Sequence, residues 1–282
     1  MGDRFAAWIG RQEEITDIVA PDAARGLVAT IASRDVAPVP GEPAPLLTHW
    51  LRFLPIVPLD RVGADGHPRR GDFLPDVDLP RRMWAGSSLR FERPVGIGTT
   101  MTLRSTIAGV AEKDGRSGRL VFVSVDHEIF DDQGLALAES QDIVYRDVPQ
   151  PGAAPPAAQP APADPHWTRR IDPDPVLLFR YSALTFNGHR VHYDRPYAMA
   201  EEGYPGLVVH GPMIATLLLH ELLARHPGAD VAAFRFRAVR PIFDIAPFFV
   251  CGSLSADGIA HLFARDETGA LCMDATATLR AA

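Results

Sequence analysis

Apolar and polar residues alternate along two series of segments, one in each half of the chain. The first series occupies residues 87–95, 100–115, 119–134 and 135–148. The second series occupies residues 232–243, 248–258, 259–269 and 271–280. A period of two residues is typical of strands, and the Asp-Gly, Ser-Gly, Gln-Gly and Thr-Gly pairs between the segments are typical of tight turns. We therefore expect an antiparallel sheet in each half.

Two segments have the pattern of helices. Residues 211–225 carry apolar side chains at helical spacing, and the Pro227-Gly228 pair that follows predicts the end of that helix. Another helix is expected from Pro21 to about Ser33, because proline favours the first helical position. Residues 175–186 are interpreted as a strand that leads into a polar loop. The rest of the chain before Gly86 is interpreted as irregular and rich in turns.

A stretch rich in proline and alanine, residues 148–166, separates the two series. It has little to bury, so we interpret it as an extended, semi-rigid linker between residues 1–147 and residues 167–282. Each half then needs a helix to cover one face of its sheet, which predicts an α+β fold. The second half has such a helix, whereas the helix of the first half is less evident.

The composition excludes several classes of protein. With 282 residues, 46% of them apolar, the chain can fill the core of a globular protein, and its formal net charge of −7 argues against a nucleic-acid partner. Local basic pairs such as Arg81-Arg82 could still meet a phosphorylated ligand. No apolar run approaches the roughly 20 residues that span a bilayer, so we expect a cytoplasmic protein without membrane segments. Cys251 and Cys272 are expected to be buried free thiols.

Ionisable groups are concentrated between Asn187 and Asp194, in the sequence NGHRVHYD. About twenty residues later, His210-Gly211 opens the helix expected at residues 211–225. The start of a helix exposes backbone N–H groups that can hold an oxyanion, and a histidine nearby can move a proton. This combination suits chemistry at an acyl thioester, in which an enolate forms.

These two stretches resemble the MaoC-like hydratases of the hot-dog fold. In this sequence the family histidine falls on His192, the His-Gly pair on His210-Gly211, and a small hydroxyl residue on Thr216. Asn187 stands where the family has aspartate, and His189 and Arg190 replace the usual Asn-Pro.

The variant resembles one branch of that family, the type 2 3-hydroxyacyl-thioester dehydratases and the mesaconyl-C4-CoA hydratases. FNGHRVHYD carries the resemblance together with three motifs of the first half: HWLRFLP at residues 49–55, DGHPRRGDFLP at 65–75 and RRMWAG at 81–86. The resemblance implies a double hot-dog fold, in which the first half is degenerate and lines the substrate site and the second is catalytic. It leaves open a homodimer of double hot-dogs.

By the same resemblance the protein is expected to be a hydro-lyase that reversibly adds water to an α,β-unsaturated acyl-CoA. The implied substrate is a C5 dicarboxylyl-CoA such as mesaconyl-C4-CoA or itaconyl-CoA, with citramalyl-CoA as product. A 3-hydroxyacyl-thioester dehydratase of fatty acid synthesis, an acyl-CoA thioesterase and a non-catalytic acyl-CoA binding module stay open. No cofactor is expected, because coenzyme A is part of the substrate.

Three residues are expected to do the chemistry. His192 would carry out acid and base catalysis from a polar loop outside the core, Asn187 would hold the water, and the backbone N–H of Gly211 would polarise the carbonyl. Asn187 could equally cap its turn. For His189 we expect a role in the turn or in support of the site, for Asp194 a helix N-cap, and for His210 packing and hydrogen bonding at the helix start.

The remaining candidates concern the substrate. Arg190, Arg195 or one of the arginines at 235, 237 and 240 could meet a substrate carboxylate or a CoA phosphate, with a slight preference for the first two. Trp84 could line the site or fill the core. No metal is expected, because the histidines show neither a His-Glu-x-x-His pattern nor a Cys-His ligand spacing.

Overall fold

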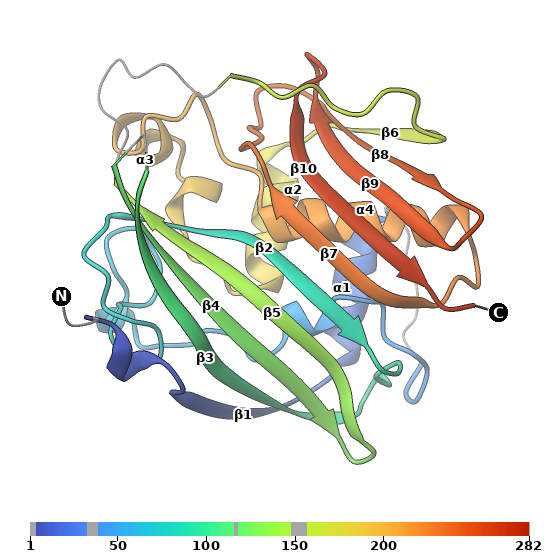
Figure 1. The fold of residues 1–282 in the computed structure, drawn as a ribbon, viewed down its shortest axis with the longest axis horizontal. Helices are drawn as coiled ribbons and strands as arrows, with labels where there is room; N and C mark the ends of the chain where they lie inside the picture. The colour runs from blue at the N-terminus through green and yellow to red at the C-terminus, as the bar shows by residue number, and fades with distance from the viewer. Residues whose placement is uncertain (1–3, 33–38, 116–117, 148–156, 282) are drawn as a thin grey trace.

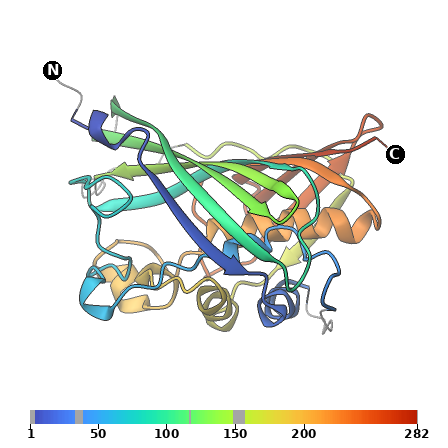
Figure 2. The ribbon, with the colours of Figure 1, turned by 90° about the horizontal axis from the view of Figure 1, so that it is seen from below.

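The computed structural model describes residues 4–32, 39–115, 118–147 and 157–281. Ten antiparallel strands form one continuous sheet in the order β1-β3-β4-β5-β2-β7-β10-β9-β8-β6. The first five strands in this order come from the first half of the chain, and the other five come from the second half (Figure 1). The helices gather on one face of the sheet (Figure 2).

The strands of the first half are β1 (Gln12–Ile18), β2 (Arg81–Phe91), β3 (Thr100–Gly115), β4 (Gly118–Asp131) and β5 (Gly134–Arg146). The four strands that the alternating pattern predicts are confirmed. Strand β1 was missed, because most of its side chains are exposed and several are charged. Strand β2 begins earlier than expected, within the region that was interpreted as irregular.

The strands of the second half are β6 (Trp167–Ile171), β7 (Val231–Ala238), β8 (Phe248–Leu254), β9 (Ile259–Asp266) and β10 (Leu271–Leu279). The halves join where residues 86–90 of β2 pair with residues 233–237 of β7. Gly86 permits this junction, because a Cβ at that position would lie 2.4 Å from the backbone oxygen of Phe236. The sheet is therefore continuous across the two halves.

Helix α4 (Gly211–Arg225) is confirmed as the central helix of the second half, with nine buried residues, and it packs against β8, β9 and β10. Helix α1 (Pro21–Ile31) is confirmed as well. The strand expected at residues 175–186 is wrong: these residues form α2 (Pro175–Leu184). Asp174 caps α2 by accepting the N–H of Leu177, and the buried residues Leu178, Tyr181 and Ser182 recur at helical spacing.

Short helices connect these elements. They are η1 (Ala6–Trp8), η2 (Thr48–Leu51), η3 (Leu59–Arg61), η4 (Arg190–His192) and α3 (Arg195–Ala200). One hydrophobic cluster runs beneath both halves of the sheet, from Met101 and Ile129 in the first half through Phe234 to Leu217 in α4. A core shared in this way makes the two halves cooperate in folding.

Residues 148–156 of the expected linker lie outside the described residues. The described part of the linker lies beside the turn between β9 and β10. There the N–H of Leu271 donates to the backbone oxygen of Gln159, and the N–H of Ala161 donates to that of Gly269. Cys251 and Cys272 are buried free thiols, as expected. No helix in the described ranges is long and apolar enough to cross a membrane.

Candidate active site

The polar stretch that stands out in the sequence connects α2 to α3. Asn187 begins it with a turn in which its Oδ1 accepts the backbone N–H of His189 at 3.0 Å. Asp194 ends it as the N-cap of α3, where its Oδ1 accepts the N–H of Tyr197 at 3.1 Å. Both capping roles are confirmed. Water binding by Asn187 stays a prediction.

His192 is the last residue of η4 and is buried, with 8% of its surface exposed. The expectation that it lies in a polar loop outside the core is therefore wrong, because the ring of His210 stacks on it at 3.6 Å. Its Nδ1–H donates to the backbone oxygen of Val208 at 2.7 Å. Burial lowers the pKa of His192 to about 4. The imidazole is thus neutral at neutral pH, and Nε2 carries a lone pair that can accept a proton.

The start of α4 lies directly behind this imidazole. His210 is the N-cap residue, and its Nε2 lies 2.8 Å from the hydroxyl of Ser182. Burial has the largest effect on the pKa of His210, and the neighbouring His192 has the next largest. Both lower this pKa well below its ordinary value. Gly211 is the first helical residue, where backbone N–H groups have no acceptor within the helix. A Cβ on Gly211 would meet nothing within 4 Å, so the space beside its Cα is open.

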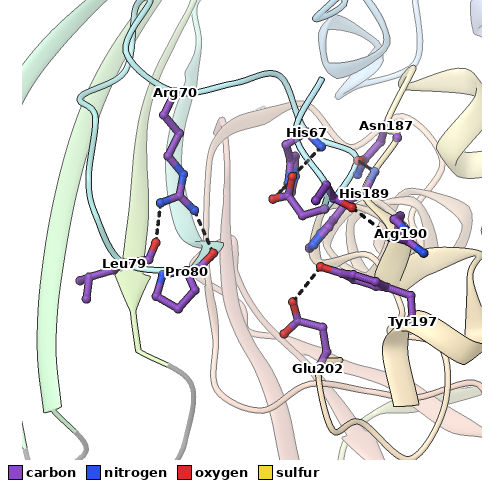
Figure 3. Close-up of polar contacts among 12 residues, drawn as sticks. His67, Arg70, Leu79, Pro80, Asn187, His189, Arg190, Tyr197 and Glu202 are labelled. Carbon is purple, nitrogen blue, oxygen red and sulfur yellow. Dashed lines mark hydrogen bonds and ion pairs between the residues drawn. The ribbon is translucent and has the colours of Figure 1, made fainter. Parts of the chain in front are cut away.

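A turn from the first half packs against the turn at Asn187. This turn, Asp65 to His67, has a similar hydrogen bond, since Oδ1 of Asp65 accepts the N–H of His67 at 3.1 Å. Gly66 has a φ of +89°, and a Cβ on it would lie 1.8 Å from the backbone oxygen of Gly188. The two glycines therefore let the two turns meet backbone to backbone, and the rings of His67 and His189 lie 4.1 Å apart (Figure 3).

Arg190 fastens the two turns together. Its backbone N–H donates to the oxygen of Asp65 at 2.9 Å, and its Nη1 donates to the oxygen of Ala64 at 3.1 Å. The guanidinium also pairs with Asp194 at 2.8 Å and lies 4.1 Å from the ring centre of Tyr197. Arg190 thus has a structural function that follows from its contacts with the first half (Figure 3).

Charge in the histidine cluster is set by burial. Burial has the largest effect on the pKa of His189, and the neighbouring His67 and His192 have the next largest. Together they lower this pKa to about 2. Burial and the charge of Arg82 lower the pKa of His67. Burial alone would raise the pKa of Asp65, but hydrogen bonding from His67 lowers it below its ordinary value. The cluster therefore combines an ionised carboxylate with neutral imidazoles.

These groups could also hold a metal ion. One donor atom each from Asp65, His67 and His189 lies within 4.8 Å of the other two. A carboxylate and neutral imidazoles are common ligands of divalent metals. The expected absence of a metal stays a prediction.

Three further candidates are engaged within the protein. Arg195 pairs with the buried carboxylate of Asp244. The hydroxyl of Thr216 is buried and donates to the backbone oxygen of Pro212 at 2.8 Å. Trp84 packs edge-on against Trp50 with ring centres 5.1 Å apart. The packing interpretation of Trp84 is therefore confirmed, and its contact with substrate stays a prediction.

The sequence interpretation gave no role in the site to Asp65, His67 or Arg82. A signal for the first two was present, because Asp-Gly-His at residues 65–67 parallels Asn-Gly-His at residues 187–189. The structure brings together these residues, Asn187, His189, Arg190, His192, His210 and Gly211. The exposed Arg235 and Arg237 on β7 stay on the surface.

Comparisons with known proteins agree with this architecture. Residues 47–244 match the model of a family described as hydroxyacyl-thioester dehydratase type 2. The chain is 45% identical to mesaconyl-C4-CoA hydratase of Chloroflexus aurantiacus over 275 residues, which cover 98% of each protein. A MaoC-like dehydratase from Phytophthora capsici has a similar structure, with a TM-score of 0.69 and 17% identity, over 96% of this chain and 95% of that one.

A protein of Mycobacterium tuberculosis described as a double hot-dog also matches, with a TM-score of 0.54 and 14% identity over 96% of both chains. These structural likenesses confirm the α+β double hot-dog fold.

Proposed function

The chain belongs to the hydroxyacyl-thioester dehydratase type 2 family, and on that premise we propose that it hydrates mesaconyl-C4-CoA or a closely related C5 dicarboxylyl-CoA. It is an enoyl-thioester hydratase, a carbon–oxygen lyase that adds water across the double bond next to the thioester. The identity of 45% to a mesaconyl-C4-CoA hydratase, along nearly the whole of both chains, carries the proposal.

The site supplies the groups that this reaction needs. The N–H of Gly211, at the first position of α4, would hold the thioester oxygen, where negative charge develops as water attacks C3. Nε2 of His192 would take a proton from the water and return it to C2, which leaves the enzyme unchanged after each turnover. Since Nδ1 of His192 is held by Val208, only Nε2 is available for this transfer.

A cation beside the site supports a dicarboxylate as substrate. We expected Arg190 or Arg195 in this role, but each already pairs with a carboxylate of the protein. Arg81 likewise pairs with Glu202 at 2.8 Å. Arg82 has no ion pair with a carboxylate in the described part of the chain, and its charge lowers the pKa of both His67 and His189. Arg82, which also interacts with the side chain of Tyr145, is the arginine that we propose to meet the free carboxylate of the substrate.

Steady-state hydration of mesaconyl-C4-CoA and of crotonyl-CoA tests the proposal. We expect the wild-type protein to prefer mesaconyl-C4-CoA and to release no free CoA, as followed with a thiol reagent. Arg82→Gln should lower kcat/KM for mesaconyl-C4-CoA by about 10-fold or more, because a hydrogen bond between charged groups contributes roughly 1.5–3 kcal/mol. Crotonyl-CoA should be much less affected.

Arg235→Gln is the matched control, because it removes an exposed arginine from β7. Equal losses for both substrates in Arg82→Gln would mean that Arg82 binds the CoA moiety that the two substrates share. Wild-type preference for crotonyl-CoA would point instead to a dehydratase of fatty acyl chains.

A further inference from the structure

The second half of the protein offers the catalytic water one hydrogen-bond acceptor fewer than the MaoC-like pattern does. Asn187 occupies the position of the aspartate that the MaoC-like pattern has, and the amide oxygen of Asn187 accepts the N–H of His189. Asp194 is the nearest carboxylate in sequence, but it caps α3 and pairs with Arg190. Neither residue offers the free carboxylate that would hold a water beside His192.

The first half contributes a carboxylate and an imidazole that are hydrogen-bonded to each other, Asp65 and His67. Nδ1–H of His67 donates to Oδ2 of Asp65 at 3.0 Å, because the carboxylate can only accept. This bond fixes the tautomer of His67 and leaves the lone pair on Nε2. His192 has the same tautomer, held by the oxygen of Val208. The site thus contains two imidazoles that are anchored at Nδ1 and can accept at Nε2.

The two imidazoles both lie close to the ring of His189. Its ring centre is 4.1 Å from that of His67 and 5.4 Å from that of His192. The side chain of His67 is 19% exposed, so solvent reaches this edge of the cluster. A water can therefore reach His67 without displacing the core around His210.

We propose that Asp65 and His67 of the first half replace the missing aspartate, and that Nε2 of His67 accepts one hydrogen of the catalytic water. This inference rests on the proposed hydration reaction and assigns a further catalytic residue to it. His67 contacts the water, whereas Asp65 acts through His67 and is a positioning residue.

His192 is the group that carries the proton in this step. One O–H of the water donates to His67 and stays intact, while the other breaks and its proton passes to Nε2 of His192. The water oxygen bonds to C3, and the π electrons of the double bond move into the thioester enolate. His192 then returns its proton to C2. The carboxylate of Asp65 makes His67 a stronger acceptor and thereby makes the water oxygen a better nucleophile.

Asp65→Asn is the sharpest test, because the structure contains a precedent for the variant. The amide oxygen of Asn187 accepts the N–H of the histidine two residues later, so an amide at position 65 can keep the same hydrogen bond to the N–H of His67. The new amide N–H would face Nδ1 of His67 and favour a proton on Nε2, which could then no longer accept from water. We expect kcat for mesaconyl-C4-CoA to fall by about 10²-fold with little change in KM.

Nitrogen NMR of the His67 ring reports the tautomer directly and shows whether a loss of activity accompanies the change of tautomer. The proton should move from Nδ1 to Nε2 in Asp65→Asn. In a second pair of variants, His67→Gln keeps an acceptor and should retain more activity than His67→Leu. The inference fails if wild-type protein hydrates the substrate and Asp65→Asn and His67→Leu do so within threefold.

Two other outcomes are separated by the same experiment. If the wild-type protein shows no hydratase activity, the proposed function fails and the variants are not needed. If a chelator abolishes wild-type activity and Zn²⁺ restores it, then Asp65, His67 and His189 hold a metal, and the assignment of His67 as a water acceptor is overturned. We expect full activity in the presence of the chelator.

Discussion

The turns at residues 65–67 and 187–189 share one hydrogen bond between a side chain and the backbone, and the residue that accepts it differs. In each, the first side chain accepts the N–H of the histidine two residues later, at 3.1 Å and 3.0 Å, and a glycine lies between them. The first turn begins with a carboxylate and the second with an amide. Only the carboxylate reaches the ring of its own histidine. In the mechanism that we propose, the active site divides its groups between these two turns, so that neither half is complete by itself.

The two halves also cover their sheets differently. In the second half, α4 fills the curve of the sheet with apolar side chains. In the first half, a polar row of Ser105, His127 and Glu139 crosses three strands. Residues of η2 cover it: Nε2 of His49 and Nε1 of Trp50 lie 3.1 Å and 3.0 Å from the buried carboxylate of Glu139. The HWLRFLP motif is therefore a structural anchor for the first half.

The largest expected effect comes from removing the imidazole at the end of η4, just after the second turn. His192→Ala should lower kcat by about 10²-fold or more, because the variant loses a general acid and base. Circular dichroism and the thermal midpoint should show that the fold persists. His226→Ala is the control, because His226 packs on Trp167 at the far end of α4. Hydration within tenfold of wild type would remove His192 from the mechanism.

A pH series tests whether the buried cluster is neutral. The folded pKa of His192, about 4, is below the value of about 6.5 for an unfolded chain. The unfolded state therefore binds a proton first as the pH falls, and the folded state loses stability between pH 6.5 and 4. We expect His192 to contribute a loss of roughly 2 kcal/mol between pH 7 and 5. Urea unfolding of the wild type and of His192→Gln at both pH values measures this loss. The same loss of unfolding free energy in both proteins would contradict a neutral His192.

The contact between the two turns can be broken at Gly66. Gly66→Ala places a methyl group where the oxygen of Gly188 lies 1.8 Å away, so the turns must separate. Gly98→Ala has a similar φ of +87° but meets nothing within 4 Å. Both variants should lose about 1–2 kcal/mol from backbone strain. Only Gly66→Ala should also lose activity, by about tenfold, because misplaced catalytic groups lower rates steeply. Equal activities would show that docking of the turns is dispensable.

The smallest effect is expected from a variant in which both turns begin with a carboxylate. Asn187→Asp adds a carboxylate to a site that we propose for a dicarboxylyl-CoA. Two like charges ~6 Å apart at an effective dielectric of ~20 repel by roughly 3 kcal/mol before screening, and a third of that raises KM about fivefold. The rise should be confined to mesaconyl-C4-CoA. The same change of KM for crotonyl-CoA would argue against an anionic substrate end.

Much of this protein is determined by the sequence alone. The period of two residues predicted eight of the ten strands, because it reports directly which face of a strand is buried. The proline and the apolar spacing predicted α1 and α4. The motif around His192 and Gly211 identified two segments that meet at the start of α4. Local patterns were also misleading where two periods compete: residues 175–186 are apolar enough for a strand, yet their buried side chains follow a helix.

Only the tertiary structure decided how the site is completed. Gly66 and Gly188 are far apart in the chain, and nothing in either turn says that the other packs against it. The same holds for the arginines, which appear equivalent in sequence. In the structure Arg81, Arg190 and Arg195 have carboxylate partners, and Arg82 has none among the described residues. Periodicity reports that a surface is covered, whereas the identity of the covering segment depends on packing between distant parts of the chain.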